Sequence, residues 1–347
     1  MEGISLEELQ LAARNHGMPL EALRFPITPV GLHYLLIHYD VPVVDAADWR
    51  LAVVGGQELS LGLDELRARP ALEVTATMEC AGNGRARLDP RPVSQPWLLE
   101  AVGTATWTGT PLRPLLEEAG VSAGAVEVLF TGLDRGVEGG EEQRFQRSVP
   151  LDEALRDDVL LAYAMNGAPL PPQHGFPLRL LVPGWYGMTN VKWLERIELL
   201  DRPFEGYQQS WSYRLRQEEE EPGEPLQRML PRSLLVPPGI PEFLTRDRTV
   251  ESGECLLEGR AWSGLAPVER VEVSGDGGKT WGEAEVEPPE SRWAWRGWRF
   301  RWDARPGEHD LCSRARDEAG NEQPLEPAWN LGGYSNNAVQ TVHVTVI

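Results

Sequence analysis

The sequence has 347 residues, of which 41% are hydrophobic, and a formal net charge of −20. This length is enough for two domains with substantial cores, whereas the negative charge argues against nucleic-acid binding, which needs a concentrated basic surface. No stretch approaches the roughly 18 consecutive apolar residues of a membrane span, and residues 1–10 lack a basic segment followed by an apolar one. We therefore expect a protein without a membrane span that is cytoplasmic, or periplasmic if an export signal was removed.

Helices and strands are interleaved in the first part of the chain. Ser5 followed by Glu8 is a capping-box pattern that predicts a helix from about Leu6 to Asn15. Strand-like stretches follow at 49–54, 72–78, 126–131 and 178–182, and Thr110 with Pro111 opens a helix between the second and third of them. Because these elements show no regular βαβ repeat, they indicate a mixed α+β domain.

The composition changes between about residues 203 and 241. This segment contains the acidic run Glu218–Glu221 and several prolines, which predicts a solvated linker. Beyond it, short alternating runs such as Val268–Ser274 and Trp298–Trp302 are separated by turns and predict an all-β sandwich of immunoglobulin type. We therefore divide the chain into a first domain, residues 1–230, and a second domain, residues 231–347.

The three cysteines stand apart in the sequence. Cys80, Cys255 and Cys312 form no Cys-x-x-Cys pair, so zinc-ribbon, iron–sulfur and haem-attachment patterns are absent from the sequence. Cys255 alternates in phase with the apolar Leu257, whereas Cys312 alternates in phase with the charged Arg314. The two side chains should face opposite sides of their strands, which predicts free thiols rather than an immunoglobulin-type disulfide.

The segment Met78-Glu79-Cys80-Ala81-Gly82-Asn83-Gly84-Arg85 runs from a strand into a glycine-containing turn that displays a cysteine. A small buried residue at a strand end is the ordinary interpretation of such a cysteine. Arg85 and the turn amides favour a thiolate, which binds a soft metal or acts as a nucleophile. The nucleophile would require a histidine base, for which His38 and His174 are candidates.

Basic residues recur in a second segment. His174-Gly175-Phe176-Pro177-Leu178-Arg179 is followed by Lys192-Trp193 inside an apolar, aromatic run. Histidine, arginine and lysine side chains that converge from a turn and two strands suit a phosphate-bearing, anionic cofactor.

Together these two segments resemble the molybdopterin domain of sulfite oxidase and assimilatory nitrate reductase. The C-A-G-N-x-R turn is similar to the family's metal-ligand loop, and H-G-F-P-x-R with V-K-W-L is similar to its cofactor-anchoring stretch. The second domain resembles the family's dimerisation domain through Ala261-Trp262-Ser263-Gly264 and Trp329-Asn330-Leu331. The resemblance covers the chain from about Thr28 onward. It implies an α+β molybdopterin domain with mixed sheets, an all-β immunoglobulin-like domain and a homodimer.

The resemblance also implies roles for individual residues. Cys80 would bind molybdenum, and Asp134 would approach the metal. The pterin and its phosphate would be held by His38, His174, Arg179 and Lys192, and the oxyanion pocket would be lined by Arg85, Trp97 and Tyr213. Sulfite oxidases carry a substrate-facing arginine where this chain has Leu36. Isobutyl in place of guanidinium removes bidentate oxyanion recognition, which puts sulfite specificity in question.

The function that we expect is that of a mononuclear molybdenum enzyme catalysing oxo transfer. Sulfite and water would give sulfate, and two electrons would pass to a separate carrier such as a cytochrome, with no haem in this chain. A reductase of an S-oxide, an N-oxide or nitrate is the nearest alternative, so the substrate would be a small anion or an S- or N-oxide. A non-enzymatic protein and a cysteine-nucleophile enzyme are more distant alternatives.

Overall fold

The structure is a computed structural model that describes residues 3–347. Its first element is helix α1 (Leu6–Arg14). As predicted, Ser5 and Glu8 form its capping box: the Glu8 amide donates to Ser5 Oγ at 3.2 Å, and the Ser5 amide donates to Glu8 Oε2 at 2.9 Å. Glu8 is buried and pairs with Arg91. This pair fastens α1 to the loop that follows Cys80.

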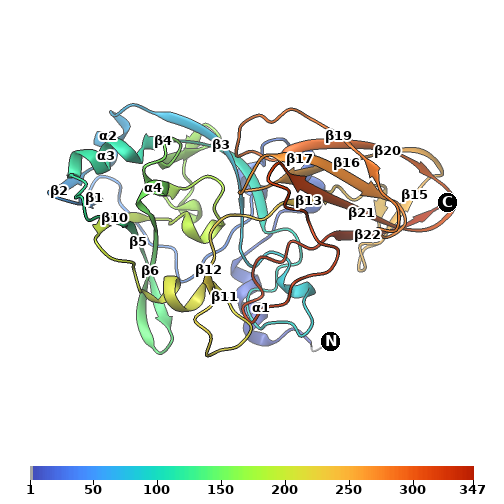
Figure 1. Cartoon of the computed structure of the whole chain (residues 1–347), viewed down its shortest axis with the longest axis horizontal. Coiled ribbons are helices and arrows are strands. Elements are labelled where there is room, and N and C mark those ends of the chain that lie inside the picture. Colours follow the sequence, from blue (N-terminus) through green and yellow to red (C-terminus); the bar gives the residue numbers. More distant parts are fainter. Residues whose placement is uncertain (1–2) are drawn as a thin grey trace.

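Two sheets form the first lobe, at the left and centre of Figure 1. The first sheet has the order β2 (Glu58–Leu61), β1 (Leu51–Val54), β10 (Leu194–Leu200), β5 (Glu127–Glu138) and β6 (Glu141–Pro150). The second has the order β3 (Leu72–Glu79), β4 (Val102–Pro111), β7 (Leu160–Met165) and β8 (Ala168–Pro169), with β9 (Arg179–Leu181) also paired to β7.

The first lobe combines these sheets with short helices. Strands β1 and β10 are parallel, whereas the other pairs of the lobe are antiparallel. The connecting helices are α2 (Leu63–Arg67), α3 (Leu112–Ala119) and α4 (Leu151–Ala154), and α3 starts directly after Pro111 as predicted. The mixed α+β class is therefore confirmed. Among residues 3–347, no helix has the length and apolarity to cross a membrane.

The second lobe is a sandwich of two sheets, at the right of Figure 1. One sheet comprises β13 (Arg232–Leu235), β16 (Gly253–Trp262), β20 (Arg296–Ala304) and β19 (Glu285–Val286). The other comprises β14 (Ile240–Pro241), β15 (Arg248–Val250), β22 (Gln340–Val346), β21 (Gly307–Asp317), β17 (Val268–Ser274) and β18 (Gly282–Glu283). Inward-facing residues of both sheets, such as Val271, Trp298 and Val344, make one core. This architecture confirms the immunoglobulin-like prediction.

The segment predicted as a linker is only partly one. The acidic run Glu218–Glu221 is exposed as predicted, and it lies in the turn between β11 (Arg214–Leu215) and β12 (Glu224–Pro225). By contrast, β13 is completely buried and pairs with β16 in the sandwich. The prolines that flank this strand on both sides predict a loop, whereas its pairing with β16 makes it a buried strand.

The cysteine prediction holds. Cys255, Cys312 and Cys80 are free thiols. Cys255 packs against the sandwich core, whereas Cys312 lies outside that core cluster beside Thr341. Cys312 is nevertheless buried, so facing away from the core does not expose it to solvent.

The two lobes share one continuous interior. The largest apolar cluster includes residues of both lobes, among them Trp185 from the first and Trp262 and Trp295 from the second. The edge strand β3 is covered by the second lobe: the Thr77 amide donates to the Trp293 carbonyl at 2.9 Å, and the Trp295 amide donates to Thr77 Oγ1 at 2.8 Å. Covering an edge strand satisfies backbone groups that would otherwise face solvent. The strand that leads to Cys80 is thus held from both lobes.

Candidate cofactor and substrate site

Cys80 lies between two adjoining hollows. The first, here called the basic hollow, encloses about 680 Å³ and is lined by His33, His174, Arg179 and Lys192 among others. The second, here called the aromatic hollow, encloses about 1130 Å³, part of it open to solvent, and its lining includes Arg85, Trp97, Tyr213 and Tyr334. Leu36, His38, Cys80 and Tyr213 line both hollows. A group bound at Cys80 can therefore be reached from either side.

Hydrogen bonds of the backbone fix the position of Cys80 directly after β3. Its amide donates to the Ala101 carbonyl at 2.9 Å, and its carbonyl accepts from the Asn83 amide at 2.9 Å. Gly84 has φ +92°, a conformation that favours glycine. A β-carbon at Gly82 would lie within 2.9 Å of the Arg85 guanidinium. The glycines of the loop thus allow its tight turn and the close approach of Arg85.

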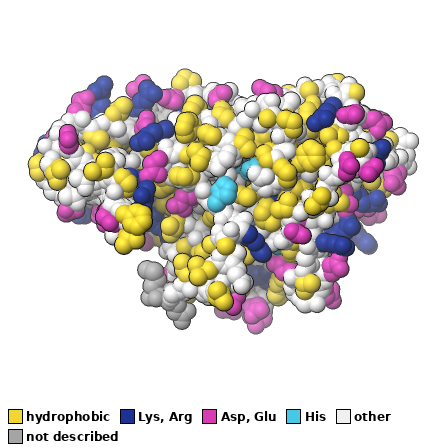
Figure 2. Space-filling view, turned by 180° about the vertical axis from the view of Figure 1, so that it is seen from behind, with side chains coloured by type: hydrophobic (Ala, Val, Ile, Leu, Met, Phe, Trp, Pro, Cys, Tyr) yellow, Lys and Arg dark blue, Asp and Glu magenta, His cyan; other side chains and the backbone are white. Residues whose placement is uncertain are grey.

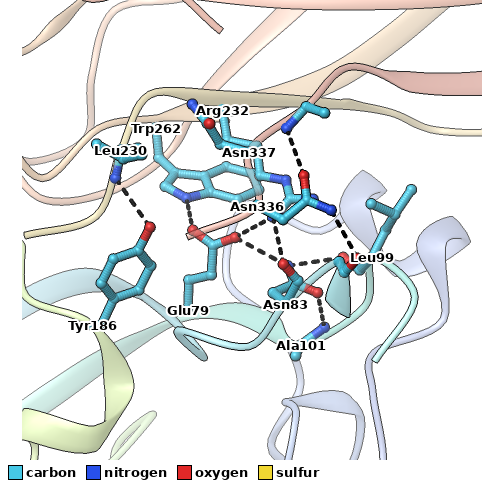
Figure 3. Close-up of polar contacts among 12 residues, drawn as sticks. Glu79, Asn83, Leu99, Ala101, Tyr186, Leu230, Arg232, Trp262, Asn336 and Asn337 are labelled. Carbon is cyan, nitrogen blue, oxygen red and sulfur yellow. Dashed lines mark hydrogen bonds and ion pairs between the residues drawn. The ribbon is translucent and has the colours of Figure 1, made fainter. Parts of the chain in front are cut away.

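A buried polar network supports the Cys80 loop from behind (Figure 3). Glu79 accepts from Asn83 Nδ2 at 3.0 Å, from Arg232 Nη1 at 2.6 Å and from Trp262 Nε1 at 2.9 Å. Asn83 Oδ1 accepts from the Ala101 amide at 3.1 Å. Glu79 and Asn83 flank Cys80, whereas Arg232 and Trp262 belong to the second lobe. The network therefore joins both lobes immediately behind the thiol.

The protonation of Cys80 differs from what the sequence suggested. Burial raises the pKa of the thiol, although the charge of Arg85 and the Gly82 amide act in the opposite direction. Arg85 is thus outweighed by desolvation, which sequence spacing alone does not report. In the metal-free chain Cys80 is a protonated thiol, and a bound metal ion would displace that proton.

The basic hollow gathers the three basic residues predicted from the second segment. Arg179 donates from Nη1 to the His174 carbonyl at 3.1 Å and lies 4.7 Å from the centre of the Trp107 ring. Lys192 Nζ donates to the carbonyls of Leu36 at 2.8 Å and of Gln173 at 3.1 Å. Burial, followed by the charge of Arg179, lowers the pKa of Lys192. These cations are held by backbone carbonyls rather than by carboxylates.

Several polar atoms at the basic hollow lack partners within the described chain. Arg179 Nε, His33 Nε2 and Asp134 Oδ1 are buried without a hydrogen bond. Burial lowers the pKa of His33 to about 4 and raises that of Asp134, although Lys192 and His38 oppose the latter shift. Buried polar groups in proteins are normally hydrogen-bonded, so these atoms indicate a site built for a polar ligand.

The aromatic hollow places residues of both lobes around Cys80. Arg85 donates from Nε to the Gly332 carbonyl at 2.8 Å and from Nη1 to the Gln95 carbonyl at 3.3 Å. Its guanidinium lies 4.9 Å from the centre of the Tyr334 ring. The buried Trp97 indole N–H lies close enough to the Cys80 sulfur to lower the pKa of the thiol, against the larger effect of burial. This wall offers aromatic faces and one fixed cation.

His38 connects the two hollows. Its Nε2 lies 3.0 Å from Glu138 Oε2, and its Nδ1 lies 3.4 Å from the Tyr213 hydroxyl. Glu138 also accepts from Tyr39 at 2.8 Å. Burial raises the pKa of Tyr213 well above its ordinary value. Tyr213 therefore presents a neutral hydroxyl to the same two hollows that Cys80 lines.

The structure brings all nine predicted site residues to these hollows. Arg85 and Trp97 line the aromatic hollow, Asp134, His174, Arg179 and Lys192 line the basic hollow, and Cys80, His38 and Tyr213 line both. The sequence interpretation missed His33, Glu138, Tyr334 and the Gly332 carbonyl. For His33 a signal existed, because it is a histidine five residues before His38 in an apolar run. For Tyr334 no local signal existed, because it belongs to the other lobe.

Comparisons with known proteins agree over both lobes. Residues 38–208 match the family model of the oxidoreductase molybdopterin binding domain, and residues 226–347 match that of the Mo-co oxidoreductase dimerisation domain. Mitochondrial sulfite oxidase of Rattus norvegicus is 38% identical over 92% of this chain and 62% of its own length. Sulfite oxidase of Gallus gallus is 39% identical over 92% of this chain and 73% of its own length.

More distant relatives differ in their named activity. An NADH nitrate reductase of Solanum lycopersicum is 31% identical over 92% of this chain but only 38% of its own length. The crystal structure of the sulfane dehydrogenase SoxCD from Paracoccus pantotrophus superposes with a TM-score of 0.82 at 27% identity, covering 99% of this chain and 90% of that one. The chain spans 62% of the length of the rat and human relatives.

Proposed function

This chain belongs to the sulfite oxidase family of molybdopterin-dependent oxidoreductases, and on that premise we propose that it is a mononuclear molybdenum enzyme of oxo transfer. In the direction we favour, sulfite and water give sulfate, two protons and two electrons. The position of Cys80 between a basic and an aromatic hollow carries this proposal, because it separates a cofactor side from a substrate side.

The residues of the basic hollow fit a phosphate-bearing cofactor. The hollow combines cations held by backbone carbonyls with unpartnered polar atoms, and Cys80 offers a soft sulfur ligand. Within residues 3–347, no group of three or more histidine, cysteine or acidic side chains is arranged to hold a metal ion. A metal at Cys80 would therefore take its remaining ligands from the cofactor itself.

We assign the roles of the lining residues accordingly. Cys80 would be the protein ligand to molybdenum, with Asp134 near it. The pterin and its phosphate would be held by His38, His174, Arg179 and Lys192. When bound, the cofactor would supply the two-electron redox change and the transfer of the oxygen atom. The protein would supply orientation and electrostatic stabilisation.

The aromatic hollow would bind the substrate. Arg85 would offset the charge of an oxyanion, because its guanidinium is buried and fixed by two carbonyls. Tyr213 would place its neutral hydroxyl beside a substrate oxygen, and Trp97 would exclude water from one side. His38 would keep the Tyr213 hydroxyl oriented through its Nδ1.

Two electrons must leave the site after each oxidation. We propose that they pass to a separate carrier such as a cytochrome, with no haem in this chain. Among residues 3–347, no Cys-x-x-Cys-His segment occurs that would attach a haem covalently.

The alternative functions are less well supported. A reductase of an S-oxide, an N-oxide or nitrate would use the same site, but the nitrate reductase relatives match less of their own length. A cysteine nucleophile would need a base at Cys80, yet in residues 3–347 no histidine nitrogen hydrogen-bonds its sulfur, and burial raises its pKa. A non-enzymatic protein without a cofactor would leave the buried polar atoms of the basic hollow without hydrogen-bond partners.

Metal analysis and turnover test the proposal together. Protein produced in a molybdenum-sufficient host should contain about one molybdenum per chain, and should oxidise a sulfur oxyanion with ferricyanide as acceptor. The same preparation should be assayed in reverse with reduced viologen and S-oxides, N-oxides and nitrate. Protein without molybdenum would contradict the metal assignment, and turnover confined to the reductive direction would support the reductase.

A further inference from the structure

The aromatic hollow contains a single buried cation. Arg85 is only 4% exposed, and its Nη2 makes no hydrogen bond to any residue from 3 to 347. Arg14 also lines the hollow, but it is exposed and donates to the His38 carbonyl at 3.3 Å. Solvent screens an exposed charge far more than a buried one. One free guanidinium nitrogen is thus the principal attraction for an anion.

Negative charge adjoins the same hollow. Although burial alone would raise its pKa, Glu138 keeps a lowered pKa because His38 and Tyr39 donate hydrogen bonds to it. Glu138 is therefore ionised at neutral pH and brings one negative charge to the wall of the hollow. In a partly desolvated site a second negative charge on the substrate is strongly disfavoured. The charges on the wall fit a monoanion better than a dianion.

The rest of the wall includes an apolar face. Leu36 lines the hollow beside Cys80 and packs against the apolar cluster that contains Trp97. Leu11 of α1 lines the same hollow. The space of this hollow, part of which is open to solvent, exceeds what a four-atom anion fills. The hollow therefore suits a molecule with one anionic head and an apolar substituent.

We infer that the site prefers organic sulfinates, R–SO₂⁻, over sulfite, and would oxidise them to sulfonates. This inference rests on the proposed oxo-transfer function and names its substrate class. A sulfinate carries one negative charge and a sulfur lone pair, and its substituent R would lie against Leu36 while Arg85 binds an oxygen. The balance is R–SO₂⁻ + H₂O → R–SO₃⁻ + 2 H⁺ + 2 e⁻. One sulfur–oxygen bond forms, the two O–H bonds of water break, and the acceptor takes both electrons.

The test compares a homologous series on the molybdenum-loaded full chain. Methane-, ethane-, propane- and butanesulfinate are assayed beside sulfite with ferricyanide, two equivalents per turnover, against enzyme-free blanks. If each added methylene is buried against the wall, kcat/KM should rise about fourfold per methylene, and each sulfinate should exceed sulfite. Calorimetric titration with butanesulfonate, the product, should show tighter binding than with methanesulfonate. This second measurement does not require turnover.

Substitutions at residue 36 locate the effect. Leu36→Ala should flatten the dependence on chain length, whereas Leu36→Arg should raise kcat/KM for sulfite by about ten- to a hundredfold. Leu256→Ala is the matched control, because this leucine is 54% exposed on β16 of the second lobe. This control should show the same dependence of kcat/KM on chain length as the wild type.

The possible outcomes distinguish a failure of the substrate inference from a failure of the proposed oxo-transfer function. If wild type oxidises sulfite at least as efficiently as every sulfinate, with no dependence on chain length, the substrate inference is wrong and the oxo-transfer function stands. If the molybdenum-loaded protein oxidises neither class, the proposed oxidative function fails as well. If kcat/KM rises steeply with chain length and Leu36→Ala does not change this rise, other residues of the hollow contact the substituent. That result would overturn the role given to Leu36.

Discussion

Arg232 in the second lobe and Glu79 in the first form an ion pair of 2.6 Å whose side chains are 1% and 3% exposed. Glu79 immediately precedes Cys80, so this pair connects the sandwich to the residue proposed as the metal ligand (Figure 3). The Nε and Nη2 atoms of Arg232 lack hydrogen-bond partners in residues 3–347. The carboxylate is well satisfied while the guanidinium is not, so loss of the arginine should matter chiefly through the charge left on Glu79.

We predict that Arg232→Met lowers the free energy of unfolding by about 3–5 kcal/mol, because it leaves the Glu79 charge buried without its partner. The double variant Glu79→Gln/Arg232→Met should regain much of this loss, since the uncompensated charge is gone. Urea denaturation followed by circular dichroism measures both. Equal losses in the single and double variants would show that packing, not charge, dominates.

Arg301→Met is the matched control for that experiment. Arg301 and Glu254 also form an ion pair, here between the neighbouring strands β20 and β16, but their side chains are 75% and 68% exposed. Breaking this pair should change the free energy of unfolding by less than about 1 kcal/mol. A larger change would mean that the denaturation reports strand pairing in the sandwich instead of buried charge.

We predict that Cys80→Ser abolishes turnover and leaves the fold and much of the pterin in place, because the basic residues assigned to the pterin lie elsewhere. Turnover, molybdenum content and released pterin fluorescence should be measured on the same preparation. Cys255→Ser provides the control, since Cys255 lies against the sandwich core. Wild-type activity in Cys80→Ser would overturn the metal-ligand assignment.

The buried imidazole of His33 should make the cofactor-free protein sensitive to acid. Its pKa is lowered from 6.5 to about 4, first by desolvation. Between pH 6.5 and 4 this histidine is protonated in the unfolded chain and neutral in the folded chain. Its effect on the free energy of unfolding is therefore absent above pH 6.5, and the free energy of unfolding falls as the pH drops toward 4. The loss should reach at most about 3 kcal/mol. His33→Gln should reduce this slope in urea titrations, and the part that remains should come from His174, whose pKa burial lowers to about 2.

Homodimerisation is expected through the second lobe, whose residues 226–347 match a dimerisation domain. Its tryptophans Trp262, Trp295 and Trp298 are buried within the chain, so they cannot form the contact. Ile240 on β14 is 71% exposed, and Phe243 and Leu244 on the loop that follows it are 84% and 80% exposed. We expect this loop in the interface, and Phe243→Asp should give monomers by light scattering at micromolar concentration. A wild-type monomer would contradict the expectation.

The surface charge is consistent with the sequence-based expectation about partners but does not test it. On the face shown in Figure 2, basic side chains are interspersed with acidic ones, and hydrophobic side chains extend across the middle around visible histidines. Interspersed charges do not produce the continuous positive potential that a phosphate backbone requires.

The sequence predicted those parts of the site that depend on local order. The strand before Cys80 and the turn after it follow from alternation and glycine placement. Lys192 was recognisable because a lysine inside an apolar run is unusual. The protonation of Cys80 was predicted in the wrong direction, because the opposing effect is burial, and burial depends on packing from residues distant in the chain.

Residues supplied by the second lobe could not be predicted. Arg232, Gly332 and Tyr334 are between about 150 and 250 positions from Cys80 and Arg85, and they reach the site through docking of the lobes. The spacing of hydrophobic residues along the sequence does not indicate contacts between such distant residues. The same reason explains the error at β13, where prolines indicated a loop and the paired strand β16 imposed a buried extended conformation.

The covering of β3 by the backbone of Trp293 has a consequence for the ancestry and the engineering of this architecture. The first lobe ends at an unfinished sheet edge, and within residues 3–347 the ion-pair partner of Glu79 is Arg232 of the second lobe. A gene fusion that transferred the first lobe alone would carry an exposed strand and a buried, uncompensated carboxylate next to Cys80. The two lobes should therefore be inherited as one module, and a chimaera with a foreign second lobe should need its own counterparts of Arg232 and Trp293.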